Sequence, residues 1–145
     1  MGPEELVKML QAAISPVVLI SGVGLLLLSM TNRLGRVVDR CRLLSKESRT
    51  APPEVAERIR HQIQLLSGRA RLLRNAIVAG SLSILLVGVL ILGLFAEVLF
   101  KLPITVLLIA VFMGCITSLI VSMVYFLKDL TLSLKALWVE ITDEI

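Results

Sequence analysis

The chain has 145 residues, of which 57% are hydrophobic and 18% are charged, and its mean hydropathy is +0.92. Soluble domains are about half apolar and a quarter charged, so this composition indicates a membrane protein. Because the apolar residues lie in long blocks, too little sequence remains for a separate catalytic domain, and we expect no enzymatic activity.

The apolar blocks predict three membrane-spanning helices, since crossing a hydrocarbon core of about 30 Å takes roughly 20 helical residues. The first regular helix is expected to begin at Ser15, a plausible N-cap followed by Pro16. The expected order is a short outer interfacial helix over 1–15, a first span over 16–32, a basic cytoplasmic helical hairpin over 33–75, a second span over 76–100, a third span over 103–127 and a cytoplasmic C-terminal helix over 128–145. An unstructured tail is the open alternative for residues 1–15.

The distribution of charge predicts the orientation in the membrane. Residues 31–75 carry eleven Lys and Arg against four acids, a net charge of +7, whereas the rest of the chain carries −3. Cytoplasmic loops collect Lys and Arg, so we expect this loop and the C-terminus inside and the N-terminus outside. The loop contains no Phe, Tyr or Trp, which disfavours nucleic-acid binding.

The basic loop has the apolar periodicity of a helical hairpin. Thr50-Ala-Pro-Pro53 interrupts the helical pattern, because proline lacks the backbone donor and disfavours a helix before it. The expected stripes are Leu34, Val37, Val38, Cys41 and Leu44 before the break, and Val55, Ile59, Ile63, Leu66, Ala70, Leu73 and Ile77 after it. Such stripes serve either two helices that shield each other or an interface for oligomerisation or a partner.

Few side chains offer chemistry inside the spans. Glu97 lies near the end of the second span, where we expect an ion pair with Lys101. The single His61 has no neighbouring ligands at metal-binding spacing. No phosphate-binding loop or catalytic constellation is present, so neither a metal nor a cofactor is expected. In the later spans, Gly80, Ser83, Gly88, Gly93, Gly114, Ser118 and Ser122 indicate helix packing faces.

The first span has one face of small and polar residues from end to end. A helix lining an aqueous path in a ring of identical subunits shows this pattern, with Leu25 as an apolar constriction. The expected pore-lining residues are Ser15, Val18, Gly22, Leu25, Ser29 and Asn32, and Arg33, Arg36, Asp39 and Arg40 are expected at the cytoplasmic mouth. Close packing against another helix is the alternative, since Gly and Ser also let helix backbones approach.

The stretch from Ile14 to Arg40 resembles a bacterial family of small three-span membrane proteins, domain of unknown function 2721. The resemblance covers nearly the whole chain, although the later spans match only in hydropathy. The most specific part is Met30-Thr-Asn-Arg-Leu-Gly-Arg-Val-Val-Asp-Arg40. The resemblance implies a bacterial inner-membrane location and the fold described above, and it implies no activity.

The combined expectation is an all-α membrane protein that assembles into a homo-oligomeric bundle and acts as an ion channel, with the first span lining the pore. The alternative is a non-conducting membrane adaptor or scaffold whose basic hairpin binds a protein partner or anionic lipid. Its expected partners are other copies of itself, membrane lipids and inorganic ions.

Overall fold

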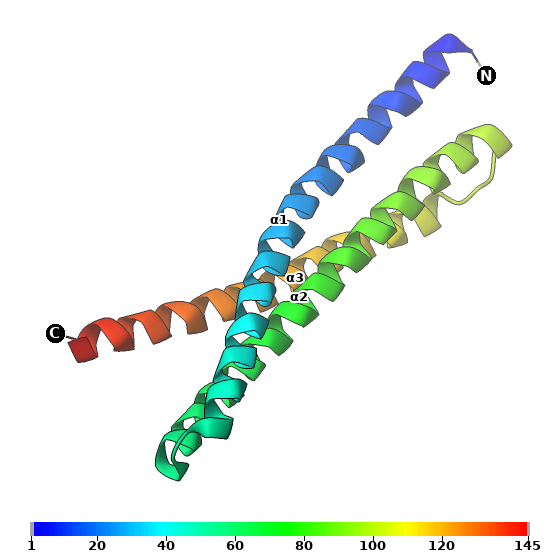
Figure 1. Cartoon of the computed structure of the whole chain (residues 1–145). Coiled ribbons are helices and arrows are strands. Elements are labelled where there is room, and N and C mark those ends of the chain that lie inside the picture. The colour runs from blue at the N-terminus through cyan, green and yellow to red at the C-terminus, as the bar shows by residue number, and fades with distance from the viewer. Residues whose placement is uncertain (1, 145) are drawn as a thin grey trace. The chain divides into compact units, whose positions relative to one another are not determined.

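The protein consists of three long helices, α1 (Pro3–Thr50), α2 (Pro53–Phe100) and α3 (Thr105–Glu144), seen in Figure 1. This computed structural model describes residues 2–144, without the side chains of residues 136, 139, 140 and 142–144. At 1.5 Å per residue, the 48 residues of α1 extend about 72 Å, well beyond the thickness of a membrane core. Stretches of α1, of α2 and of Thr105–Lys135 in α3 are long and apolar enough to cross a membrane.

Helix α1 runs without a break from Pro3 through the first span. The short outer helix expected over 1–15 and the span expected to begin at Ser15 therefore form one helix, and Pro16 lies inside it. Proline removes only its own backbone donor, and apolar membrane helices tolerate this loss where the surroundings satisfy the freed carbonyl group. Glu4 and Glu5 occupy the first turn, where negative charge complements the positive end of the helix dipole.

The breaks between the helices are formed by local backbone chemistry. Helix α1 ends at Thr50, and α2 begins at Pro53 after the two residues Ala51 and Pro52, with the Ala56 amide donating to the Pro52 carbonyl at 2.9 Å. At the end of α2, Lys101 adopts a left-handed conformation with φ of 52°, which is common directly after a helix but rare for a residue other than glycine. Pro103 then prevents α2 from continuing.

The chain forms two compact units, each built from segments of all three helices. The first unit comprises Met1–Leu28 and Val78–Val121, and the second comprises Ser29–Ile77 and Ser122–Ile145. In the second unit, the segments of α1 and α2 on either side of the Ala51–Pro52 turn run in opposite directions (Figure 1). Of the residues in the predicted stripes, Val37, Leu44, Ile59 and Leu73 are buried, whereas Val55 is exposed.

Each helix turns a line of residues at seven-residue spacing toward its neighbours. The buried positions are Met9, Val23, Met30, Val37 and Leu44 in α1, Ile59, Leu73, Gly80 and Val87 in α2, and Leu108, Cys115, Ser122 and Asp129 in α3. A seven-residue repeat keeps one narrow seam of a helix in contact with its neighbour. A second buried line in α2, with Ala76, Ser83 and Leu90, adds to these contacts, and the exposed surface that remains is left for lipid or for other partners.

Small polar residues hold the helices together inside both units. In the first unit, the Ser83 hydroxyl lies 3.2 Å from the Cys115 carbonyl and the Ser118 hydroxyl 2.6 Å from that of Ala79. In the second unit, Ser122 donates to the Ala76 carbonyl at 2.6 Å. The predicted packing faces are thus confirmed at these serines, whereas Gly88 has no other group within 4 Å of the position of a β-carbon.

Many large apolar side chains are exposed, while a few polar side chains are buried between the helices. Val106 is 82% exposed, and Leu92 and Phe100 are each 72% exposed, whereas Ser83, Ser122 and Asp129 are buried. In water such a surface would be a liability, but in a bilayer it is the favourable arrangement, because lipid tails contact the apolar side chains.

Candidate functional site

The only carboxylate among the buried residues of the described chain is Asp129, on α3 in the second unit. Its side chain is 0% exposed, and both of its oxygens accept hydrogen bonds from arginines. Arg33 of α1 donates to Oδ2 from Nε at 3.1 Å and from Nη2 at 3.0 Å, and Arg69 of α2 donates to Oδ1 from Nε at 3.1 Å. One side chain from each helix therefore meets at this point.

The two arginines neutralise the buried carboxylate of Asp129, and the cluster as a whole keeps one net positive charge. A buried carboxylate is tolerated only when it is paired and hydrogen-bonded, and Asp129 has a guanidinium on each oxygen. The Arg33 and Arg69 side chains remain 24% and 22% exposed, so parts of both guanidinium groups reach the surface. The Arg33 guanidinium also lies 5.9 Å from the centre of the Phe126 ring, within the range of a cation–π contact.

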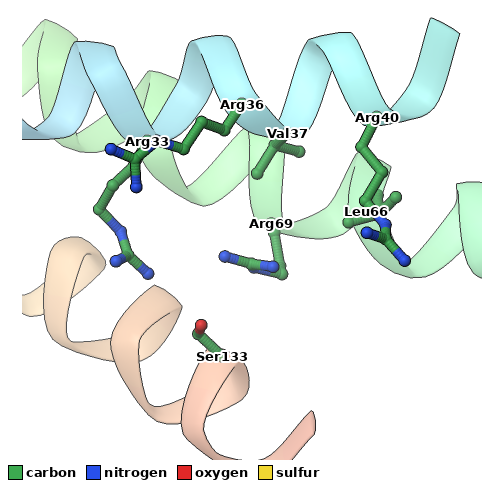
Figure 2. A pocket seen from close by; sticks show the side chains of 7 residues that line it. All are labelled: Arg33, Arg36, Val37, Arg40, Leu66, Arg69 and Ser133. Carbon is green, nitrogen blue, oxygen red and sulfur yellow. The ribbon is translucent and has the colours of Figure 1, made fainter. Parts of the chain in front are cut away.

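A pocket of about 200 Å³ opens beside the cluster. Figure 2 shows Arg33, Arg40 and Arg69 reaching from α1 and α2 toward the space in front of α3, from which Ser133 projects. The lining residues are Arg33, Arg36, Val37, Arg40, Leu66, Arg69 and Ser133. Among the described residues, the lining of this pocket therefore includes four arginines and no acidic residue.

Helical spacing explains how the pocket is assembled. Arg33, Arg36 and Arg40 follow one another at three- and four-residue intervals, which places them along one side of α1. On α2, Leu66 and Arg69 are three residues apart, and on α3 Asp129 and Ser133 are four residues apart. Each helix thus presents one side to the same space.

The six predicted pore-lining residues are exposed in the single chain. They are Ser15, Val18, Gly22, Leu25, Ser29 and Asn32. The buried line of α1 passes through Val23 and Met30, and these six residues lie away from it. A β-carbon at Gly22 would meet nothing within 4 Å, so no described part of the chain covers that position.

The four residues predicted at the cytoplasmic mouth have different surroundings. Arg33 is held by Asp129, whereas Arg36 and Arg40 line the pocket without an ion pair in the described part of the chain. Asp39 is exposed and is not among the residues that line the pocket.

Sequence reasoning missed two members of the cluster. Arg69 contributes to the net charge of +7 over residues 31–75, and Asp129 contributes to the −3 of the rest of the chain, but nothing in those totals singles out either residue. The available signal is that Asp129 continues the seven-residue line through Cys115 and Ser122. A charge on a line of small packing residues is expected to have a buried partner.

The predicted ion pair between Glu97 and Lys101 is wrong. The Glu97 carboxylate instead accepts a hydrogen bond from the Thr105 hydroxyl, because the left-handed Lys101 redirects the chain and starts α3 within reach. Among the described residues, no group of three or more His, Cys, Asp or Glu side chains could hold a metal ion.

Three apolar helices with small polar residues in their seams indicate a small α-helical membrane protein. The chain belongs to the family described as protein of unknown function DUF2721, which it matches over residues 13–139. This confirms the resemblance to this family and its extent over nearly the whole chain. Neither a curated protein nor a solved structure matches the chain.

Proposed function

We propose that this protein is a homo-oligomeric ion channel in which α1 lines the pore. The observation that carries the proposal is the exposure of the small and polar face of α1. The side chains of Ser15, Ser29 and Asn32 have no hydrogen-bond partner within the described chain. Polar groups at membrane depth need water or a neighbouring protein, and a ring of α1 helices around an aqueous path supplies water.

The other helices are better covered than α1. In its most apolar stretch of 18 residues, 11% of α1 is buried, compared with 22% in both α2 and α3. An assembly that places α1 at its centre covers the helix that the single chain covers least. Leu25, 70% exposed, then forms an apolar constriction that closes the path by excluding water.

The distribution of charge and the family resemblance support an orientation and a membrane for the proposed channel. The net charge of +7 over residues 31–75 supports an orientation with this basic segment and the C-terminus in the cytoplasm and the N-terminus outside. The bacterial family that the first span resembles implies the inner membrane. In this arrangement Arg36, Asp39 and Arg40 stand at the cytoplasmic mouth, where their charges bias the passage of anions and cations.

A second candidate function is a non-conducting adaptor, which uses the same face of α1 to pack against another protein. The open space around Gly22 and Gly24 favours it, because a missing β-carbon lets a partner helix approach closely. In this case the face meets protein rather than water.

Measurements of thiol accessibility and of ion flux distinguish the channel from the adaptor. In a background lacking Cys41 and Cys115, single cysteines at Gly22 and Ser29 are compared with cysteines at the half-buried Ile20 and Leu27. For a channel, the reconstituted oligomer conducts, and a small aqueous thiol reagent blocks flux only through the first pair. An oligomer that passes no ion, with unreactive cysteines at Gly22 and Ser29, supports the adaptor. A monomer in detergent and in nanodiscs contradicts the channel, since three spans cannot enclose a pore.

Orientation has a separate test. Cysteines at Lys46 and Lys101, in the same background, are exposed to an impermeant thiol reagent in intact cells. Only the cysteine at Lys101 is expected to react from outside. Labelling of both positions from outside would contradict the proposed orientation.

A further inference from the structure

The arginine-lined pocket of the second unit has an excess of positive charge that no described carboxylate neutralises. Four arginines line the pocket, and among the described residues Asp129 is the one carboxylate that pairs with any of them. Three positive charges are therefore uncompensated around a space of about 200 Å³. Like charges held together in a partly enclosed site repel one another, and a bound anion removes that repulsion.

The donors in this pocket are ready to bind an anion. Arg33 uses Nε and Nη2 for Asp129, and Arg69 uses only Nε, so the remaining N–H groups are available. Arg36 and Arg40 pair with no carboxylate of the described chain. Asp129 holds Arg33 and Arg69 in place, which lowers the entropy cost of binding at those two side chains.

We propose that this pocket binds a phosphate group. Guanidinium is planar and donates two parallel hydrogen bonds, which matches the oxygens of a phosphate. A cavity holds a water molecule once a water-sized probe can occupy about 10–15 Å³, so the pocket of about 200 Å³ has room for a phosphate group. The Ser133 hydroxyl in the lining provides a neutral donor in addition to the arginines.

The place of the pocket along the chain relates it to the membrane surface. Arg33 follows the apolar run that ends at Met30, and Asp129 follows the run that ends at Leu127. Basic pockets between helices at this depth bind lipid head groups. The phosphate therefore comes either from an anionic lipid or from a soluble phosphate compound, and both present the same chemistry. The site goes beyond the proposed channel and does not depend on it.

The test measures binding rather than ion flux, so its failure is separate from that of the channel. The full-length protein is placed in nanodiscs of phosphatidylcholine alone or of phosphatidylcholine with phosphatidic acid, and native mass spectrometry counts the retained phosphatidic acid. In a second arm, inorganic phosphate is titrated at constant ionic strength against phosphatidylcholine nanodiscs, with chloride as the reference anion. The test variant is Arg36→Gln with Arg40→Gln. The control is Arg42→Gln with Arg49→Gln, which removes the same charge from exposed positions of α1 outside the pocket.

Binding of either probe is expected in the wild type and in the control, and at least tenfold weaker in the test variant, because charge-assisted hydrogen bonds are lost. Retention of phosphatidic acid alone identifies a lipid head group, and binding of inorganic phosphate alone identifies a soluble source. Equal weakening in both variants, or no binding of either probe, overturns the proposal. If the double variant fails to fold, Arg40→Gln alone is measured by the same criteria.

Discussion

The buried carboxylate of Asp129 gives the strongest quantitative expectation. In Asp129→Asn the shape is kept, but the negative charge that neutralises Arg33 and Arg69 is lost, and an amide donor faces their N–H groups. Breaking a buried ion pair costs about 3–5 kcal/mol. Because both arginine side chains remain nearly a quarter exposed, water reduces the penalty, and we expect a loss of about 3 kcal/mol, roughly a hundredfold in the folding equilibrium.

The free energy of unfolding is measured by titration with SDS in mixed micelles, with helix content as the signal. Asp39→Asn on α1 is the matched control, since Asp39 is exposed and has no ion pair with a described residue; its effect is expected within about 0.5 kcal/mol. An Asp129→Asn variant as stable as this control would refute the role of the cluster.

A triple replacement distinguishes the cost of leaving two arginines without a carboxylate from the net contribution of the whole cluster to the free energy of unfolding. Replacing Arg33 and Arg69 by Met and Asp129 by Leu removes the three charges together. Buried ion pairs can be exchanged for apolar residues of similar volume at little cost, so this variant is expected to recover most of the stability that Asp129→Asn loses. A triple variant less stable than Asp129→Asn would show that the cluster itself provides the net stability.

Three other buried positions lead to measurable expectations. Gly93→Ile overlaps with Cδ2 of Leu108, and overpacking should lower the free energy of unfolding by about 1–3 kcal/mol. Ser122→Ala loses the 2.6 Å hydrogen bond to a carbonyl of α2 and should cost about 0.5–1.5 kcal/mol in the same assay. Maleimide should label the half-buried Cys41 in the folded protein and leave the fully buried Cys115 unreacted.

Each of these expectations has a control and a contrary result. Gly88→Ile enters open space, so equal losses at Gly88 and Gly93 would contradict the packing argument. Ser81→Ala removes an exposed hydroxyl, and an identical effect at Ser122 would show that its hydrogen bond has no net value. Labelling of Cys115 as fast as that of Cys41 under native conditions would contradict its burial.

Part of the candidate site could be predicted from spacing alone. Arg33, Arg36 and Arg40 share one side of a helix by their intervals, and sequence analysis placed all three together. The contributions of Arg69 and Asp129 could not be predicted from the sequence, because they depend on which turns of different helices pack against each other. Arg33 and Asp129 are 96 residues apart, and Arg69 and Asp129 are 60 residues apart.

Local chemistry in the sequence determined the number of helices, their apolar character and the positions where they stop. Proline acts on its immediate neighbours, so the breaks at Pro52 and Pro103 needed no tertiary information. The continuity of α1 through Pro16 could not be predicted in this way, because the surroundings decide whether a helix tolerates an internal proline. The tertiary structure alone decided that Asp129 is a buried partner of two arginines, since the sequence presents a carboxylate as a solvated charge. The cost of burying it is offset only by partners that folding brings from elsewhere in the chain.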